Sequence, residues 1–146
     1  MSELDFGPIV LGGNTFGWTS DRDESFAVLD KFVANGGKSI DTADAYSAWV
    51  PGHVGGESET IIGEWLQQRS SKDEVIIATK VGSGAADIPK GLKRAQVIEG
   101  CEASLRRLGL ERIDLYFAHR DDPSTPFEET LGAFDELVRA GKVAQI

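Results

Sequence analysis

The sequence predicts an α/β fold in which a parallel sheet is covered by helices. Short apolar runs that suit strands alternate with longer segments whose apolar residues recur every three to four positions, as in amphipathic helices. The run VIIATK at residues 75–80 begins with consecutive apolar residues, which is typical of a strand covered on both faces. The order of the predicted elements is βαβαβαβαβ, which implies parallel strands joined by right-handed crossovers.

The first two predicted strands flank the first helix. Residues 9–11 form one strand and residues 38–41 the other. Between them, the segment DESFAVLDKFVANGG places Phe26, Leu29 and Val33 on one helical face, and its two glycines end the helix.

The third strand, residues 75–80, lies between two further helices. The segment SETIIGEWLQQR pairs Ile62 with Leu66, and Ile61 with Trp65, at i,i+4 spacing, which predicts a helix before that strand. A helix after the strand is predicted from a single apolar face that consists of Val97, Cys101, Leu105 and Leu108, and Gly109 ends it.

The last predicted helix has the clearest signals at its beginning. In the segment TPFEETLGAFDELVRAGK, Thr125 is predicted to cap the helix, Pro126 to occupy its first turn and Glu128 to complete a capping box. Strands are predicted on either side of it, at residues 113–119 and 142–146. Its predicted core-facing residues are Phe127, Leu131, Phe134 and Val138.

Two architectures fit this order of elements. A doubly wound sheet of five strands needs about this length, but it is expected to end with a covering helix. An eight-stranded barrel needs about 250 residues, so the chain would supply its first half and a further strand. The order of the elements leaves both open. In either one, the connections after strands are the longer ones, and they lie at the carboxyl edge, where parallel α/β folds carry their sites.

The composition limits the kinds of partner. The chain has 15 basic and 24 acidic side chains, a formal net charge of −9, and no cluster of lysine and arginine. It is therefore not expected to bind nucleic acid or an anionic membrane surface. The single cysteine, Cys101, cannot form an internal disulfide, and no early apolar run resembles a signal peptide or a membrane span. These features predict a location in the cytoplasm.

Four polar residues lie at the same predicted edge. Asp41, Lys80 and His119 end the second, third and fourth strands at equal sequence intervals, and Tyr46 lies in the loop just after Asp41. Because neighbouring parallel strands lie about 4.8 Å apart, these side chains are expected to converge. Each residue alone is more often a turn former, a solvated charge or a packing residue, but the four together favour an active site.

The group suits proton donation by a phenol. A free tyrosine has a pKa near 10, which is high for an acid–base group at neutral pH. A lysine cation about 4 Å away attracts a phenolate by roughly 4 kcal/mol at an effective dielectric constant of about 20. Asp41 is expected to hold Lys80 charged and in place, and His119 to orient a substrate oxygen. No metal site is predicted, because His53 and His119 are far apart and no Cys/His cluster exists.

These residues lie in motifs that closely resemble those of the aldo-keto reductases, which are (β/α)8 barrels that reduce carbonyl compounds with NADPH. The matching stretches are LGGNTFG, DTADAY, GGESETIIGEWL, VIIATKVG and DLYFAHRDDPSTPFEETLGAFDELVRAGKV, in family order and over nearly the whole chain. The match looks nearest to bacterial members related to channel β-subunits. The resemblance favours the TIM barrel over the doubly wound sheet, with residues 1–146 as the N-terminal half of a single barrel domain: strands one to four, their helices and the start of strand five.

The resemblance also implies roles for the polar residues. Tyr46 would donate the proton to an aldehyde or ketone, Lys80 and Asp41 would tune it, and His119 would orient the carbonyl group.

The resemblance further implies an NADPH site and a substrate pocket. Gly12, Gly13 and Asn14, with Asp41, would lie beside the nicotinamide end of the cofactor. Because Trp18 and Trp49 are predicted in loops on the same edge, they are expected to line the substrate pocket together with His119.

The length of the chain departs from the family. Members are about twice as long, so the resemblance implies a fragment that has the four catalytic residues, lacks most of the cofactor site and need not be active alone. A half-barrel exposes two strand edges and an inner apolar face, which predicts self-association. The alternative to a reductase is a non-enzymatic binding or regulatory module, or a self-pairing half-barrel, since relatives of channel β-subunits keep the same four residues while serving in an assembly.

Overall fold

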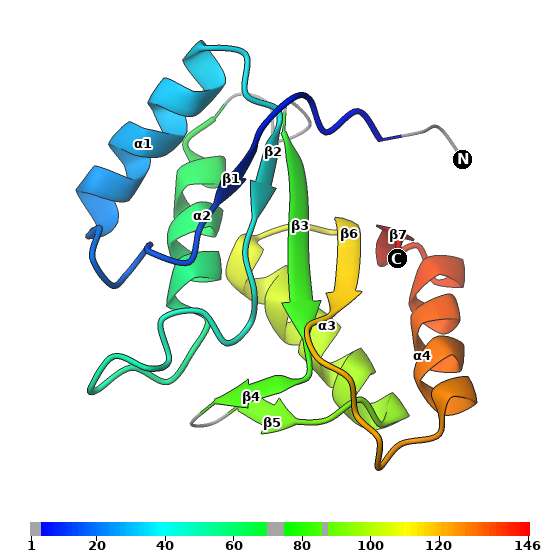
Figure 1. Cartoon of the computed structure of the whole chain (residues 1–146). Coiled ribbons are helices and arrows are strands. Elements are labelled where there is room, and N and C mark those ends of the chain that lie inside the picture. The colour runs from blue at the N-terminus through cyan, green and yellow to red at the C-terminus, as the bar shows by residue number, and fades with distance from the viewer. Residues whose placement is uncertain (1–3, 70–74, 86–87) are drawn as a thin grey trace.

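A five-stranded parallel sheet forms the centre of the molecule (Figure 1). The structure is a computed structural model that describes residues 4–69, 75–85 and 88–146. The sheet has the order β1-β2-β3-β6-β7, with every neighbouring pair parallel. Its strands are β1 (Val10–Gly12), β2 (Ser39–Asp41), β3 (Ile76–Val81), β6 (Ile113–Ala118) and β7 (Val143–Gln145).

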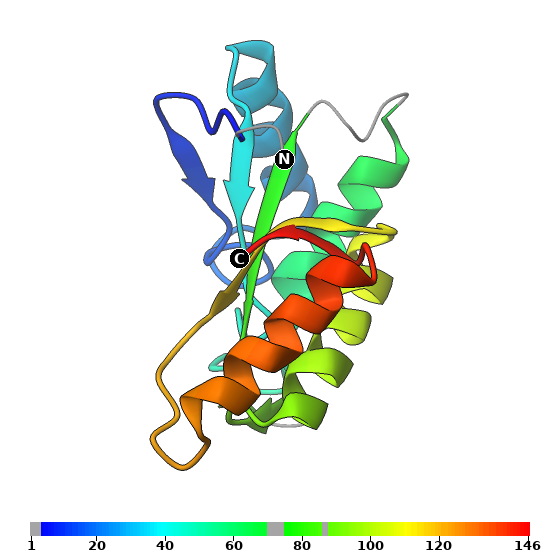
Figure 2. The same cartoon turned by 90° about the vertical axis from the view of Figure 1, so that its right-hand side faces the viewer.

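The helices lie along one face of this sheet, as Figures 1 and 2 show. They are α1 (Arg22–Ala34), α2 (Glu57–Gln67), α3 (Arg94–Leu108) and α4 (Phe127–Arg139). On the other face, Phe117 pairs with Lys80 in the sheet and is 39% exposed. The strands of the sheet follow one another in chain order without a reversal, whereas a doubly wound sheet reverses its order and carries helices on both faces. The fold is therefore part of a parallel α/β barrel, as predicted.

The core lies between the sheet and the helices. The predicted faces of the second and third helices are confirmed, because Ile62, Trp65 and Leu66 of α2 and all four predicted residues of α3 are buried. The two helices pack closely: a side chain at Gly63 would place its Cβ 2.9 Å from Leu108 Cα, so only glycine fits there. Burial raises the pKa of the Cys101 thiol to about 12, in keeping with its packing position.

Helix α4 differs from its prediction at the beginning and on its core face. Its N-cap is Pro126, with no side-chain cap, and the Thr125 hydroxyl donates instead to Asp122 Oδ2 at 2.6 Å, so the predicted capping box is wrong. Phe127 and Leu131 are 68% and 45% exposed. The helix packs through a face rotated from the predicted one, formed by Thr130, Ala133, Phe134 and Leu137.

The predicted loop between the third strand and the third helix contains a hairpin. Strands β4 (Ser83–Ala85) and β5 (Ile88–Lys90) pair antiparallel beyond the carboxyl end of β3. Residues 86–87, which connect β4 to β5 in the chain, lie outside the described residues. The hairpin therefore forms a wall at the edge where the candidate site residues lie. Among the helices that the structure describes, none is long and apolar enough to cross a membrane.

Candidate active site

Lys80 connects the polar residues at the carboxyl edge of the sheet. Its Nζ donates to Asp41 Oδ2 at 2.7 Å, to the Tyr46 phenolic oxygen at 3.0 Å and to the backbone carbonyl of Thr42 at 2.6 Å. The Tyr46 hydroxyl also lies 3.4 Å from Asp41 Oδ2. Three residues from two strands and a loop thus form one hydrogen-bonded group, with the phenol at its accessible end. The side chains of Lys80 and Asp41 are 15% and 26% exposed.

His119 faces the phenol from the end of the neighbouring strand. The two rings are perpendicular, with centroids 5.7 Å apart and an interplanar angle of 78°. Burial lowers the pKa of His119, and the nearby charges of Lys80 and Arg120 lower it further, against the opposing effect of Asp41. The imidazole is therefore neutral at neutral pH and has one N–H to donate. Its Nδ1 is buried and has no hydrogen-bond partner among the residues that the structure describes.

A tight turn orients Tyr46. Ser47, directly after it, has a positive φ of 70°, which is uncommon for a residue other than glycine. The buried Ser47 hydroxyl donates to the carbonyl of Phe16 at 2.7 Å and so ties this turn to the loop after β1. This contact fixes the turn that directs the phenol toward Lys80.

A chain of hydrogen bonds joins the loops after β1 and β2 to helix α2. Gly13 N donates to the carbonyl of Asp41 at 2.8 Å, and the Ser58 hydroxyl donates to the carbonyl of Gly13 at 2.7 Å. The hydroxyls of Ser58 and Thr42 are 2.9 Å apart. The loop that was predicted to face a cofactor is thereby held against the strand that ends at Asp41.

The residues predicted to contact a cofactor differ in accessibility. Gly12, the register partner of Asp41, and Asn14 are exposed, whereas Gly13 is buried. A Cβ at Gly12 would meet Asn14 Oδ1 at 3.5 Å, an ordinary contact. A Cβ at Gly13 would lie 3.0 Å from Ser58 Oγ and 3.2 Å from the Asp41 carbonyl. Gly12 and Asn14 are therefore open to a ligand, while Gly13 is required by the packing of the chain.

Aromatic rings extend from Tyr46 toward the surface. Trp49 lies edge-on to Tyr46, with ring centroids 6.1 Å apart, and Trp18 lies edge-on to Trp49 at 5.5 Å. A cavity of about 380 Å³ is lined by Trp49, Tyr46, His119, Arg120 and the hairpin strand β4. Trp18 lies one ring further out and is not part of that lining.

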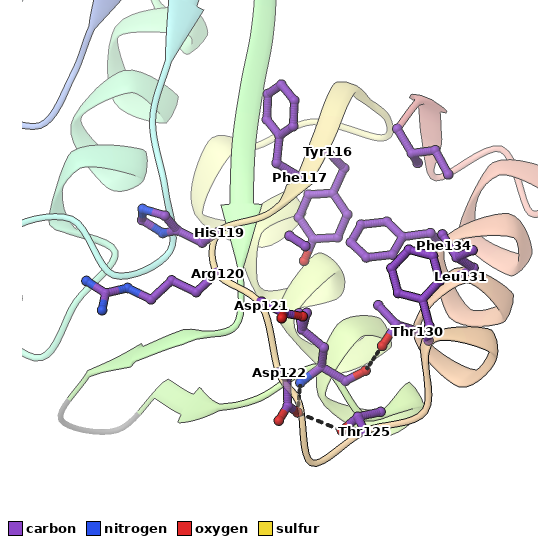
Figure 3. A pocket seen from close by; sticks show the side chains of 14 residues that line it. Tyr116, Phe117, His119, Arg120, Asp121, Asp122, Thr125, Thr130, Leu131 and Phe134 are labelled. Carbon is purple, nitrogen blue, oxygen red and sulfur yellow. Dashed lines mark hydrogen bonds between the residues drawn. The ribbon is translucent and has the colours of Figure 1, made fainter.

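A larger hollow of about 600 Å³ lies on the other side of the loop that carries His119 (Figure 3). Asp122 forms its rim, and its carboxylate accepts hydrogen bonds from the backbone N–H of Leu92 at 2.9 Å and from the hydroxyls of Ser124 and Thr125, both at 2.6 Å. These bonds hold the pKa of Asp122 well below its usual range. The loop after His119 is therefore anchored to the beginning of α3. The apolar lining includes Tyr116, Phe127, Leu131, Phe134 and Ile146.

A buried ion pair that the sequence did not reveal lies behind the site. Glu59 is fully buried, pairs with Arg107 at 2.6 Å and accepts a hydrogen bond from the Thr79 hydroxyl at 2.6 Å. These contacts join α2, α3 and β3. The only signal in the sequence was an acidic residue on the inner side of an amphipathic helix.

Asp44 is a second buried carboxyl group, between Asp41 and Tyr46 in the sequence. It is fully buried, and neither of its carboxylate oxygens has a hydrogen-bond partner among the described residues. Burial, and then the charge of Glu59, raise its pKa to about 7. The charge of Arg107 and the backbone amides of Ala45 and Gly82 oppose this rise in the pKa. The two amides lie near the carboxylate but do not meet the geometry of a hydrogen bond. Asp44 thus retains its proton up to about neutral pH.

Known proteins resemble this chain over almost its whole length. The sequence pattern of the Aldo/keto reductase family matches residues 8–146. Aldo-keto reductase str7 of Strobilurus tenacellus is 37% identical over 149 residues, which is 98% of this chain and 40% of that protein. Aldo-keto reductase YhdN of Bacillus subtilis is 35% identical over 99% of this chain and 42% of its own length. A putative voltage-gated potassium channel subunit beta of Schizosaccharomyces pombe is 42% identical over 86% of this chain and 38% of its own length.

The chain spans less than half the length of each of these three relatives. Within that length the family pattern covers the five strands of the parallel sheet and the four helices among the described residues. The partial parallel α/β barrel agrees with a fold of the aldo-keto reductase type. The chain belongs to the aldo/keto reductase family.

Proposed function

We propose that this protein reduces an aldehyde or ketone to an alcohol with NADPH, and that Tyr46 donates the proton. The observation that carries the proposal is the 3.0 Å contact between the Tyr46 phenolic oxygen and Lys80 Nζ. A cation in that position stabilises the phenolate that remains after the proton has left. Membership of an oxidoreductase family supports the reaction class.

The residues have separate tasks in this reaction. Asp41 holds Lys80 in place through the 2.7 Å ion pair, and Lys80 holds the phenol. His119, as a neutral imidazole, donates an N–H to the carbonyl oxygen and orients it toward the Tyr46 hydroxyl, which then transfers its proton to that oxygen. A nicotinamide held beside Gly12, Asn14 and Asp41 would supply the hydride to the carbonyl carbon. Trp49 and the hairpin wall limit the access of water to the carbonyl group.

The described residues fit one part of a nicotinamide site. Gly12 and Asn14 are exposed beside Asp41 at the carboxyl edge, and the absence of a side chain at Gly12 permits the close approach of a planar ring. We assign contact with the cofactor to Gly12, Asn14 and Asp41, and a supporting role to Gly13. The substrate pocket is assigned to Trp49 and His119, with Trp18 packed behind Trp49.

Replacement of the phenol tests the proposal. Tyr46→Phe is expected to lower kcat for a simple aldehyde such as 4-nitrobenzaldehyde by roughly 10²–10⁴-fold, because the proton donor is lost while the ring remains. NADPH consumption by the purified chain is the measurement, after a fluorescence titration has shown that NADPH binds. Tyr116→Phe is the matched control, since that hydroxyl is buried against the carbonyl of Val97 on the helix side of the sheet. Unchanged turnover in Tyr46→Phe would refute the mechanism.

A regulatory binding module is the second candidate, and the channel-subunit relative is the observation that favours it. A module of this kind would form a stable complex with a partner protein that Tyr46→Phe leaves intact, and it would not reduce the aldehyde. The same pair of variants therefore separates the two functions.

A further inference from the structure

Arg120 is an unpaired cation at the candidate site. It directly follows His119, is exposed, and makes no hydrogen bond or ion pair with any residue in the ranges 4–69, 75–85 and 88–146. Other exposed cations of the described chain, Arg112 among them, also lack a carboxylate partner, so it is the position of Arg120 in the cavity beside His119 that sets it apart. Two neighbouring carboxylates, Asp121 and Asp122, do not neutralise it. Asp122 instead accepts bonds from Leu92, Ser124 and Thr125.

Arg120 lies beside the proposed reaction centre. Figure 3 shows the side chains of His119 and Arg120 extending to the same side of their loop, away from Asp121 and Asp122. Arg120 lines the 380 Å³ cavity together with Tyr46, Trp49 and His119, and it is the one side chain with a permanent charge among the described residues of that lining. Its charge also acts on His119, which requires the two groups to be close.

The position of Arg120 separates it from the loop assigned to the cofactor. Gly12 ends β1, whereas Arg120 follows β6, and the sheet order places β2 and β3 between these two strands. Three strand spacings of about 4.8 Å amount to roughly 14 Å. Lys80 and Tyr46 lie between the two groups, so Arg120 is on the far side of the phenol from Gly12.

We propose that Arg120 is a substrate-recognition residue that binds the carboxylate of a small carbonyl compound, so that the preferred substrates are aldehydes or ketones that also carry a carboxylate. The proposal rests on the reductase function proposed above and names its substrate class. A guanidinium presents two parallel N–H groups that match a carboxylate, and such charge-assisted bonds are stronger than neutral ones.

The rest of the cavity fits a short, flat molecule. Its volume of about 380 Å³ lies near the lower end of the usual range for small-molecule sites. Trp49 and the alanines Ala45, Ala48 and Ala85 provide an apolar wall between the phenol and the guanidinium. A substrate would therefore place its carbonyl group at Tyr46 and His119, its apolar middle against Trp49 and its carboxylate at Arg120.

Binding of two matched product alcohols tests the proposal without turnover. The probes are 4-(hydroxymethyl)benzoate and its methyl ester, which differ in the charge of one group, and their dissociation constants are measured by ligand-observed NMR on the whole chain. The wild-type chain is expected to bind the carboxylate about tenfold more tightly than the ester, since hydrogen bonds between charged groups are worth that much. Arg120→Met should abolish the preference, and Arg120→Lys should keep part of it.

Arg112→Met is the matched control. Arg112 is an exposed arginine that precedes β6, whereas Arg120 follows it, so the control removes the same charge from the opposite end of one strand. This variant should keep the tenfold preference. Equal affinity of the wild-type chain for both probes, binding of neither probe, or a preference that survives Arg120→Met would each overturn the proposal.

Two further measurements separate this inference from the proposed function and from a cofactor contact. If the chain discriminates between the probes but reduces neither 4-carboxybenzaldehyde nor its methyl ester, the reductase function fails while carboxylate recognition stands. If it reduces both aldehydes with equal kcat/KM and Arg120→Met changes neither value, the inference alone fails. A loss of NADPH affinity in Arg120→Met, with the probe preference retained, would assign the guanidinium to a cofactor phosphate and would also overturn the proposal.

Discussion

Two groups in this molecule combine a carboxylate, a cation and a hydroxyl, and they differ in where these lie. Asp41, Lys80 and Tyr46 meet at the carboxyl edge of the sheet, where both charged side chains keep some exposure. The second group, formed by Glu59, Arg107 and Thr79, lies between two helices and the sheet, with Glu59 fully buried.

The difference between the groups is the freedom of the hydroxyl. The Thr79 hydroxyl donates its only hydrogen to Glu59 at 2.6 Å and is enclosed, so no outside molecule can compete for it. The Tyr46 hydroxyl accepts a hydrogen bond from Lys80 and faces a cavity. The proton of this hydroxyl is held only by the long 3.4 Å contact to Asp41. The same three kinds of group therefore stabilise the fold between the helices and the sheet, and they are suited to proton transfer at the carboxyl edge.

The largest expected effect comes from breaking the first group. Lys80→Met removes the cation beside the phenol and should lower kcat by roughly 10²–10⁴-fold, because the phenolate loses its stabilising charge. The fold should persist, since Lys80 lies at the edge of the sheet. Steady-state turnover and a thermal melt are the measurements. Lys142→Met, which breaks only the surface contact with Glu102, is the control and should leave turnover nearly unchanged.

Breaking the second group should have the opposite outcome. Glu59→Gln leaves Arg107 without its ionic partner, and the loss of one member of a buried pair is expected to cost about 3 kcal/mol of unfolding free energy. Urea denaturation measures this value, with Glu64→Gln, on the exposed side of the same helix, as the control. Turnover per folded molecule should stay the same. A variant as stable as the wild type would show that the pair does not hold α2 to α3.

Asp44 is a buried carboxyl group near Glu59 and Arg107, and its titration makes the stability of the chain depend on pH. Its pKa is raised to about 7 in the folded chain, mainly by burial and Glu59, whereas an unfolded aspartate has a pKa near 3.9. The folded chain therefore keeps a proton that the unfolded chain has lost between these values, and stability falls as pH rises through that window. From pH 5 to pH 7 the wild-type chain should lose about 2 kcal/mol through this group.

Asp44→Asn removes this titration while keeping the size of the side chain. The difference in unfolding free energy between wild type and variant, measured in urea at pH 5 and pH 7, should change by about that amount in favour of the variant. Parallel behaviour of the two proteins over this range would contradict the raised pKa.

Local sequence patterns predicted the sheet well because its strands are apolar and their ends are polar. Residues 75–80 and 113–119 match β3 and β6 to within one residue, since the apolar runs are bounded by charged residues. The face of α4 was not predictable, because Phe127 and Leu131 satisfy the same helical spacing as buried residues and only tertiary packing decides which face is covered. The hairpin β4–β5 was missed, since Ser83–Ala85 contains no apolar alternation.

The sequence predicted the residues of the candidate site better than their surroundings. Asp41, Tyr46, Lys80 and His119 stood out as strand-end residues, and the structure brings them together, while their catalytic roles stay a prediction. Arg120 was missed because an exposed arginine is ordinary in a sequence, and its lack of a partner is visible only in three dimensions. The assignment of residues 1–146 to one half of a barrel domain and the expected self-association also stay predictions.

The hydroxyl of Ser58 has a consequence for protein engineering. It has one hydrogen, which it donates to the carbonyl of Gly13, so in its 2.9 Å contact with Thr42 it must accept. The hydrogen bonds therefore run from Thr42 through Ser58 to the carbonyl oxygen of Gly13. They hold these segments in place but cannot relay a proton, because they end on a backbone oxygen. A graft of the DTADAY turn onto another scaffold must therefore include Gly13 and Ser58, because the residues that hold this turn lie far apart in the sequence.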